Sequence, residues 1–243
     1  MKLLYEGKAK KIYETNNPNE VICEYKDALT AFNGEKAASE SGKGALNCEI
    51  TTLIFEALQK EGIPTHLIKK IDETKQLVKK VDIIPIEVVL RNIAAGSLSK
   101  RLGLKEGTKL PFTIVEFYYK NDDLNDPLIN DDHAMILNLV DNRKELDILR
   151  DYGRKVNEFL REFFDKVGLI LVDFKIEFGK DKDGNIILAD EITPDSCRLW
   201  DKKTGQKMDK DLFRFNLGDI KEAYKEVLKR LKDVKWKSQL MFI

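Results

Sequence analysis

The sequence predicts an α+β fold, with antiparallel sheets and flanking helices, and three observations lead to that prediction. Short strand-like runs fill the first third of the chain. Long apolar stripes with helical period appear mainly in the remainder. Asp183 and Gly184 form a polar turn between two apolar runs, which indicates a β-hairpin. Strands that outnumber helices early, with helices gaining later, are typical of this class.

The first part of the chain is predicted to consist of strands around one helix. The strands are expected over residues 2–6, 11–15, 21–25, 66–71 and 76–80. The helix is expected over residues 45–60, where apolar side chains recur on one face. Gly62 is its predicted stop, because glycine favours the backbone conformation that ends a helix.

Residues 81–87 carry a proline between apolar residues and are the candidate hinge between two lobes. We therefore predict an N-terminal lobe over residues 1–84 and a C-terminal lobe over residues 85–243. The elements expected next are a strand over 86–91, a helix over 97–102 with Ser97 as its N-cap, a strand over 112–119 and an acidic loop over 121–132.

Two amphipathic helices are predicted in the C-terminal part. Residues 144–167 carry a continuous apolar stripe, which we assign to the core, and Gly168 is placed to end the helix. Residues 219–232 carry a second stripe, with Asp219 as the expected N-cap.

Composition excludes several classes of function. The 243 residues carry 42 basic and 42 acidic side chains, so no net charge draws the protein to nucleic acid or to a membrane surface. No apolar run is long enough to span a bilayer. Three cysteines without a CxxC spacing argue against a disulfide framework or a zinc site. We expect a soluble, cytoplasmic protein of a reducing compartment.

A pair of carboxylates is the first candidate site. Lys175 and Glu177 fall on one face of the strand before the turn, and Asp190 ends the strand after it. If the turn has two residues, Glu177 faces Asp190 with about 5 Å between Cβ atoms. Such carboxylates repel each other unless a cation or shared proton joins them. Two oxygen ligands suit Mg²⁺, although a solvated acidic hairpin stays an open alternative.

Three basic segments are candidate anion sites. The Gly7 turn is followed by Lys8, Lys10 and Lys11, which could cover a polyphosphate, although lysine-rich turns are commonly solvated. Arg91 ends a strand shortly before Ser97, so a helix N-terminus and a guanidinium group could share a phosphate. An ordinary serine cap beside a surface arginine is the alternative.

The turn after the candidate metal strand is the third such segment. There Arg198 is a candidate clamp for an anion, and Asp195 a candidate acceptor for a substrate N–H or hydroxyl group. Cys197 has no histidine near it in sequence, which speaks against a thiol nucleophile. The chain has only two histidines, so lysines, arginines and paired carboxylates remain, an inventory that fits phosphoryl transfer.

Longer motifs identify the chain as similar to the SAICAR synthetase family. They are YEGKAKKIY (5–13), LVKKVDIIPIEVVLRNIAAGSLSKRLG (77–103), KNDDLNDPLIN (120–130), GLILVDFKIEFG (168–179), DEITPDSCRLWD (190–201) and KMDKD (207–211). The resemblance implies an ATP-dependent ligase that joins the carboxylate of CAIR, an aminoimidazole ribonucleotide, to L-aspartate. It also implies two lobes like those of protein kinases and ATP-grasp enzymes, with ATP between them, and a homodimer.

The resemblance also implies roles for individual residues. For ATP the implied residues are Lys8, Lys10 and Lys11 at the phosphates, and Lys79 and Ile83 in the hinge segment that receives adenine. For the reaction they are Glu177 and Asp190 as Mg²⁺ ligands, with Lys175 and Lys120 facing the phosphates or the reacting carboxylate. For the ribonucleotide they are Arg91, Ser97, Asp195 and Arg198.

Two other classes of function stay open beside the ligase. A small-molecule kinase of similar build would stop at the phosphorylated product, but the chain lacks an HRD motif, and Asp173 and Phe174 are followed by Lys175 instead of glycine. A non-catalytic nucleotide-binding module would turn over no substrate.

Overall fold

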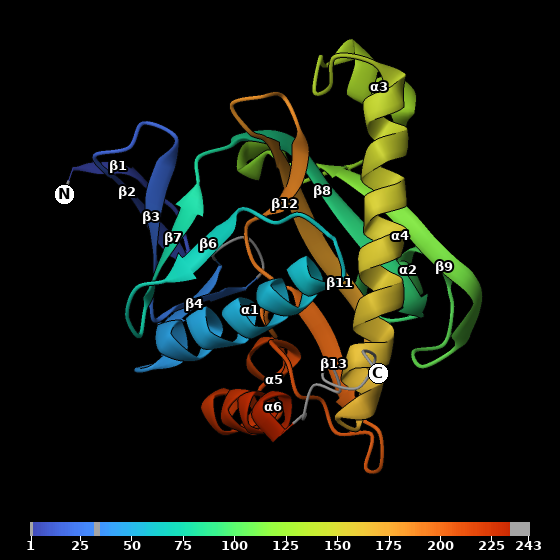
Figure 1. Cartoon of the computed structure of the whole chain (residues 1–243). Helices are drawn as coiled ribbons and strands as arrows, with labels where there is room; N and C mark the ends of the chain where they lie inside the picture. The colour runs from blue at the N-terminus through green and yellow to red at the C-terminus, as the bar shows by residue number, and fades with distance from the viewer. Residues whose placement is uncertain (1, 32–34, 234–243) are drawn as a thin grey trace, which may run out of the picture.

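The computed structural model describes residues 2–31 and 35–233, and its first strands form a five-stranded antiparallel sheet (Figure 1). The strand order is β1-β2-β3-β7-β6, with β1 at Leu3–Glu6, β2 at Lys10–Glu14, β3 at Glu20–Tyr25, β6 at Leu67–Lys70 and β7 at Lys75–Lys79. Burial alternates along β3, as expected for a strand with one face toward the core. The five predicted strands are confirmed within one or two residues.

A six-stranded antiparallel sheet follows. Its strands are β8 (Asp82–Ile93), β9 (Lys109–Tyr119), β10 (Leu128–Ile129), β11 (Leu169–Lys180), β12 (Ile186–Ala189) and β13 (Cys197–Asp201). The order is β10-β9-β8-β11-β12, and β13 also pairs with β11. The central strand β11 is buried on both faces over most of its length. A small third sheet pairs β4 (Ala28–Ala31) with β5 (Lys36–Ser39).

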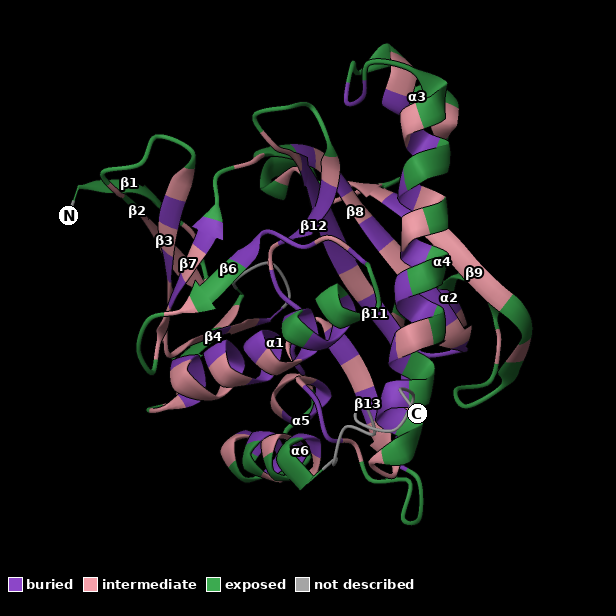
Figure 2. Ribbon diagram, in the orientation of Figure 1, coloured by how far each residue is buried: buried purple, intermediate pink, exposed green. Residues whose placement is uncertain are grey.

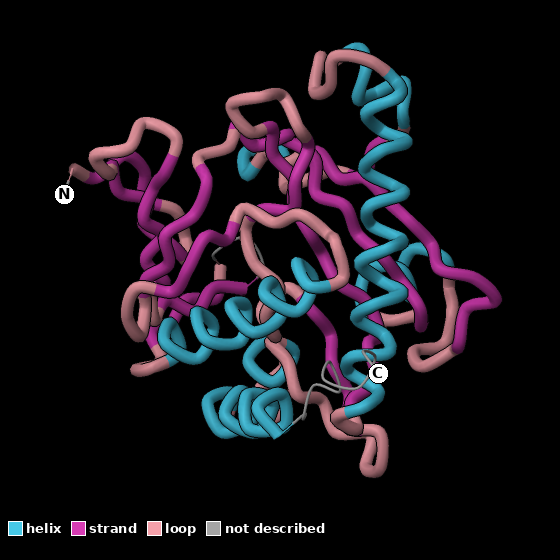
Figure 3. Tube along the Cα trace, in the orientation of Figure 1, coloured by secondary structure: helices cyan, strands magenta, loops and turns pink. Residues whose placement is uncertain are grey.

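The helices pack around these sheets (Figure 3). They are α1 (Lys43–Lys60), α2 (Gly96–Leu102), α3 (Asp131–Ile136), α4 (Arg143–Lys166), α5 (Asp211–Arg214) and α6 (Ile220–Asp233), with a short 3-10 helix η2 at Asp122–Leu124. The long helix α4 runs along the larger sheet (Figure 1). The predicted α+β class and both long C-terminal helices are confirmed.

One continuous core joins most of the chain. It extends from Leu29 of β4 through α1, the larger sheet and α4 to Leu231 of α6 (Figure 2). A smaller cluster beneath the first sheet comprises Val21, Cys23, Tyr25, Cys48 and Val78. Because α1 contributes to both clusters, it ties the first sheet to the rest of the molecule.

The connection between the two larger sheets differs from the predicted hinge. Only Lys80 and Val81 lie between β7 and β8, and residues 82–87 of the predicted hinge are already strand. Pro85 is tolerated there because it lies past the last paired residue of β9: its carbonyl oxygen accepts the backbone N–H of Lys120 at 3.0 Å, and its nitrogen faces the same side, where β9 has ended. The predicted lobe boundary at 84/85 falls inside β8, and the division into lobes stays a prediction.

Two local predictions were wrong. Helix α2 begins at Gly96 with Ala95 as its N-cap, so Ser97 lies inside the helix and does not cap it. The segment from Cys197 onward is strand β13 and not part of a turn, because it pairs with β11. The acidic loop is also more ordered than expected, since η2, β10 and the start of α3 lie within it.

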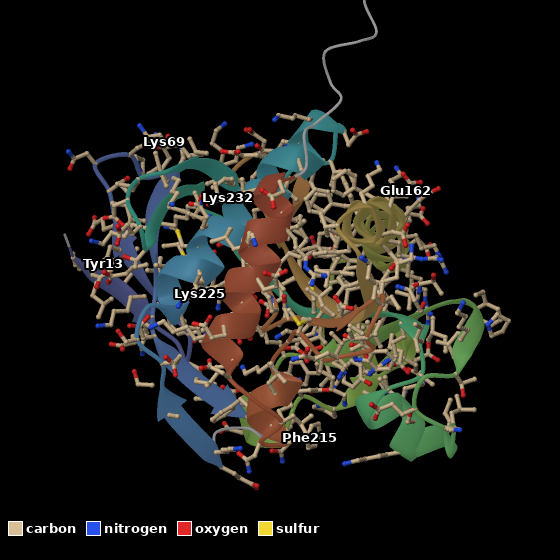
Figure 4. All side chains as sticks on the ribbon, turned by 90° about the horizontal axis from the view of Figure 1, so that it is seen from below. Tyr13, Lys69, Glu162, Phe215, Lys225 and Lys232 are labelled. Atoms are coloured by element: carbon tan, nitrogen blue, oxygen red, sulfur yellow. The ribbon has the colours of Figure 1, made fainter. Side chains whose placement is uncertain are left out.

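The C-terminal helix α6 lies beside α1, which Figure 4 shows from below. Lys232 of α6 forms an ion pair with Glu49 of α1 at 2.9 Å, and Lys225 pairs with Glu222 within α6. Asp219 caps the helix as predicted: its carboxylate Oδ1 accepts a hydrogen bond from the backbone N–H of Glu222 at 3.1 Å.

Replacement of this cap should weaken α6. We expect Asp219→Ala to lower the free energy of unfolding by about 1 kcal/mol, because one N–H of the first turn loses its acceptor. Urea denaturation monitored by circular dichroism measures the change. Asp219→Asn keeps a capping oxygen and should stay close to wild type; an equal loss in both variants would show that the cap is not the cause.

Candidate active site

A cavity of about 730 Å³ lies between the two larger sheets. Side chains of β1, β2, β3 and β7 line one side, and those of β8, β9, β11 and β13 line the other. Its volume falls within the range of about 300–1,000 Å³ that is usual for ligand sites. The predicted site residues that line it are Lys8, Lys10, Lys79, Ile83, Arg91, Ser97, Lys120, Lys175, Glu177, Asp190, Asp195 and Arg198.

The β11–β12 hairpin has a different register from the one predicted. Glu177 pairs with Ala189, so it does not lie directly opposite Asp190. The turn has three residues because the carboxylate of Asp181 accepts the backbone N–H groups of residues 183 and 185, each at 2.9 Å. Gly184, with φ 80°, closes this longer turn. The one-residue difference shifts every cross-strand pair.

Asp190 nevertheless lies in the same cavity as Glu177. It follows the last residue of β12 and has φ 59°, a left-handed conformation that breaks the alternation of the strand. Burial opposes its ionisation, but Lys10 and Lys175 outweigh burial and lower the pKa of the Asp190 carboxyl group. Asp190 is therefore a carboxylate at neutral pH.

Lysines join the carboxylates in this part of the cavity. Lys175 Nζ lies 2.5 Å from Glu87 Oε1 and 3.4 Å from Glu177 Oε1. Lys120 Nζ lies 2.8 Å from the same Glu177 oxygen. Burial lowers the pKa of Lys175, but the facing acids Glu177, Glu87 and Asp190 raise it well above its usual value. These ammonium groups compensate the negative charge of the carboxylates, and the predicted Mg²⁺ at Glu177 and Asp190 stays a prediction.

The lysines that follow Gly7 do not all point toward the cavity. Lys10 points into the cavity, where it forms ion pairs with Asp190 and with Glu191, the latter at 3.2 Å. Lys8 reaches across to Asp122 of η2 at 2.7 Å. Lys11 does not line the cavity, and its ammonium group lies 3.9 Å from Glu6. Adjacent residues of a strand face opposite sides, which accounts for the separation of Lys10 from Lys11.

An arginine cluster forms another part of the cavity wall. Arg91 is 3% exposed and donates to Glu116 at 2.7 Å and to Asp173 at 3.0 Å. Arg198 Nη1 donates to both carboxylate oxygens of Asp173, at 3.1 and 2.9 Å, and its Nε donates to Asp211. Asp173 therefore holds both guanidinium groups in place.

Ser97 belongs to this cluster through its side chain and not as a helix cap. Its Oγ accepts a hydrogen bond from Arg91 Nη2 at 3.0 Å. Gly96 leaves room for Arg198: a Cβ atom there would lie 2.5 Å from Arg198 Nη2, and φ is 53°. Glycine is thus the residue that allows the helix start and the guanidinium group to approach each other.

Asp195 anchors a buried network that connects three elements. Its carboxylate accepts hydrogen bonds from Lys43 of α1, from Asn47 at 2.7 Å and from Tyr224 of α6 at 2.7 Å. Burial opposes ionisation, but Lys210 and Lys43 outweigh it and lower the pKa of Asp195. The network fixes the turn before β13, and Asp195 also lines the cavity.

Several cavity residues were not assigned from the sequence. Glu87, Asp173 and Glu191 lie in the segments that carry the resemblance, and so does Lys210 in the KMDKD run. Each was passed over because its role depends on a partner that is distant in sequence. Lys43 likewise meets its partner, Asp195, only in the folded chain.

Glu177 and Asp190 offer carboxylate oxygens of the kind that hard divalent cations bind. Glu177 and Asp190 both line the cavity and both act on the ammonium group of Lys175, so their charges converge on one region. Within residues 2–31 and 35–233, no cluster of three or more His, Cys, Asp or Glu side chains is arranged to hold a metal ion. Mg²⁺ commonly takes one or two carboxylates and completes its shell with phosphate oxygens and water.

No helix in the described part of the chain is long and apolar enough to cross a membrane.

The fold and the cavity define a class of protein: an α+β chain whose cavity, between two antiparallel sheets, gathers cations and carboxylates. The sequence model described as SAICAR synthetase matches residues 3–231. The phosphoribosylaminoimidazole-succinocarboxamide synthase of Nautilia profundicola is 87% identical over 235 residues, which cover 97% of this chain and 100% of the relative.

Solved structures agree with the sequence match. The crystal structure of the synthase of that name from Ehrlichia chaffeensis has a TM-score of 0.92 and 47% identity, covering 96% of this chain and 99% of that one. A SAICAR synthetase in complex with ADP has a TM-score of 0.91 and 50% identity, covering 95% and 97%. The chain belongs to the SAICAR synthetase family. It is an enzyme of that family, a ligase of purine biosynthesis.

The cysteines give a test of the site's packing. Burial raises the pKa of Cys23 and Cys48 to about 12 and raises that of Cys197 as well, so all three stay protonated at pH 8. We expect the native protein to react with far less than one equivalent of Ellman's reagent within minutes. The denatured chain should react with three. A fast native thiol would contradict the packing around these residues.

Proposed function

We propose that the chain joins the carboxylate of CAIR to the amine of L-aspartate with the use of ATP, and that the products are SAICAR, ADP and phosphate. The names of the relatives and the ADP complex of a family member at 50% identity support this reaction. The observation that carries the proposal is the cavity itself. It combines two groups of side chains. The lysine–carboxylate cluster, suited to phosphates, is made of Lys10, Lys120, Lys175, Glu177 and Asp190. The arginine cluster, with Arg91 and Arg198, is suited to a ribonucleotide.

In the first step the γ-phosphoryl group of ATP passes to the carboxylate of CAIR. A carboxylate oxygen forms the new P–O bond, the bond to ADP breaks, and an acyl phosphate results. Lys10, Lys120 and Lys175 lie where they can neutralise charge on the phosphate oxygens. Their carboxylate partners keep these ammonium groups in position before substrate binds.

Glu177 and Asp190 would hold Mg²⁺, which supplies charge neutralisation at the phosphates when bound. Both carboxylates form ion pairs with lysines, so metal and ammonium compete for the same oxygens. Lys10 and Lys120 are thereby available to the phosphates.

In the second step the unprotonated amine of L-aspartate attacks the acyl carbon. A C–N bond forms, phosphate leaves with one oxygen of the former carboxylate, and the nitrogen loses a proton. Water would compete with the amine, so enclosure of the reacting groups between the two sheets protects the intermediate.

Other residues of the cavity would bind the adenine of ATP and the ribonucleotide. Lys79 and Ile83, on the strands that flank the connection between the sheets, line the place we assign to adenine. Arg91, Ser97 and Arg198 hold the ribonucleotide and its phosphate. Lys8 lines the cavity near the place we assign to the ATP phosphates. Lys11 does not line the cavity, so we propose no direct contact between Lys11 and ATP.

The proposal extends to the architecture, the compartment and the oligomeric state of the enzyme. The two larger sheets would belong to two lobes of the kind found in protein kinases and ATP-grasp enzymes. The enzyme would act in the cytoplasm, and it would form a homodimer.

Loss of the Glu177 carboxylate should impair the chemical step. We expect Glu177→Gln to lower kcat by about 100-fold or more, because one anionic ligand is lost and Lys120 and Lys175 lose a partner. ADP release with Mg²⁺, ATP, CAIR and L-aspartate measures the effect. Asp183→Asn, at the exposed hairpin tip, should match wild type.

The same assay tests the reaction class. Wild-type turnover should require both CAIR and L-aspartate. ADP release with CAIR alone and a stable phosphorylated product would indicate a kinase instead.

Crowding of Arg198 should weaken the binding of the ribonucleotide and leave the binding of the other substrates unchanged. We expect Gly96→Ala to raise KM for CAIR about tenfold or more, because the added Cβ displaces the Arg198 guanidinium group. Gly103→Ala is the matched control: φ is also positive there, at 66°, but nothing lies within 4 Å of the added atom. Equal effects in the two variants would show that backbone strain, and not Arg198, is responsible.

A further inference from the structure

A second cavity, of about 380 Å³, lies outside the candidate active site and shares no lining residue with it in the described part of the chain. Helix α6 lines one side, and the segment from Asp201 to Leu212 lines the other. Its floor is apolar, because Met208, Leu212 and Ala223 are 5%, 3% and 6% exposed. We call this cavity the α6 groove.

The rim of the α6 groove is acidic. The lining residues include one cation, Arg230, and four carboxylates, those of Asp201, Asp219, Glu222 and Glu226. Glu222 and Glu226 form their ion pairs within α6, with Lys225 and Arg230. Among the described residues, no cation of another element lies within 4.0 Å of these two carboxylates. The groove therefore combines an apolar floor with an excess of negative charge at its edge.

The chain itself contains a segment of complementary chemistry. Residues 234–243, with the sequence VKWKSQLMFI, follow α6 and lie beyond the residues that the structure describes. They include Lys235 and Lys237, no acidic side chain and six apolar side chains. They also lie beyond residue 231, where the match to the family model ends, so that match assigns them no role.

This segment is long enough to turn back along α6. Asp233 ends the helix, and Ala223 in the groove is ten residues earlier, which is about 15 Å along a helix. Ten extended residues span up to about 33 Å. A reversal of direction therefore leaves enough chain to follow the groove. In that direction the two lysines come first, beside Glu226 and Glu222, and residues 240–243 reach the apolar floor.

We propose that residues 234–243 bind in the α6 groove of the same chain. Lys235 and Lys237 pair with the acidic rim, and the apolar side chains cover the floor and lose their contact with water. The segment is tethered at the end of α6, so its effective concentration at the groove is high. This favours it over a second copy of the chain or another protein as the occupant.

The bound segment would support elements that hold active-site residues in place. Leu212 of α5 lines the groove, whereas its neighbour Asp211 pairs with Arg198 in the wall of the active-site cavity at 3.0 Å. Tyr224 of α6 donates to Asp195 of the same wall at 2.7 Å. Occupation of the groove thus restrains the two helices from the side opposite to these contacts.

Hydrogen–deuterium exchange measured by mass spectrometry tests the proposal. Removal of residues 234–243 should raise amide exchange about tenfold or more in residues 201–212 and 219–230, because a bound segment suppresses local opening of the elements that it contacts. The buried strand β11 should exchange as before.

Charge reversal separates binding in the groove from fraying of α6. Glu222→Lys combined with Glu226→Lys should give the same rise in the full-length chain, and Lys235→Glu combined with Lys237→Glu should do so with α6 unchanged. All four substitutions together should restore slow exchange, because opposite charges face each other again. Glu162→Lys, on an exposed position of α4 (Figure 4), is the control and should match wild type.

Four outcomes would overturn the proposal. Unchanged exchange after removal of residues 234–243 would show that the segment does not bind the folded part of the chain. A change confined to other elements would place the segment on another surface. A change at the groove that depends on protein concentration would make a second copy the occupant. Failure of the four combined substitutions to restore slow exchange would show that the acidic rim does not bind the lysines.

Discussion

The pairing of lysines with carboxylates across the cavity is the interaction on which the site depends. Lys10 comes from the first sheet and meets Asp190 at the end of β12, so this pair joins the two walls. Lys175 of β11 and Lys120, which directly follows β9, both meet Glu177. Charges in such a place are tolerated only when partners compensate their loss of hydration. The pairs therefore keep reactive cations and anions together in a protein whose net charge is zero.

The surrounding packing holds these charged side chains in fixed positions. Strand β11, buried on both faces, carries Asp173, Lys175 and Glu177 on a rigid support. Asp195 links the turn before β13 to α1 and α6, so the helices outside the sheets help to position a residue that lines the cavity. Side chains on rigid elements hold a substrate more accurately than those on loops, which favours transfer between bound groups.

Sequence patterns predicted the elements well, because periodicity and glycine or aspartate caps are local signals. Asp219 and Gly168 lie at the predicted ends of their helices. The register of the hairpin was not predictable in the same way. A side-chain acceptor at Asp181 lengthened the turn by one residue, and the left-handed backbone at Asp190 then brought that carboxylate into the cavity without cross-strand pairing.

The most direct test of the proposed phosphoryl transfer follows the oxygen atoms of the CAIR carboxylate. CAIR would be labelled with ¹⁸O in both carboxylate oxygens and turned over with ATP and L-aspartate, and the phosphate would be analysed by mass spectrometry or ³¹P NMR. If the cavity transfers the γ-phosphoryl group to the carboxylate, each phosphate released should carry one ¹⁸O atom, and the other should stay in the product amide. Unlabelled phosphate would contradict an acyl phosphate and the alignment of substrates proposed for this cavity.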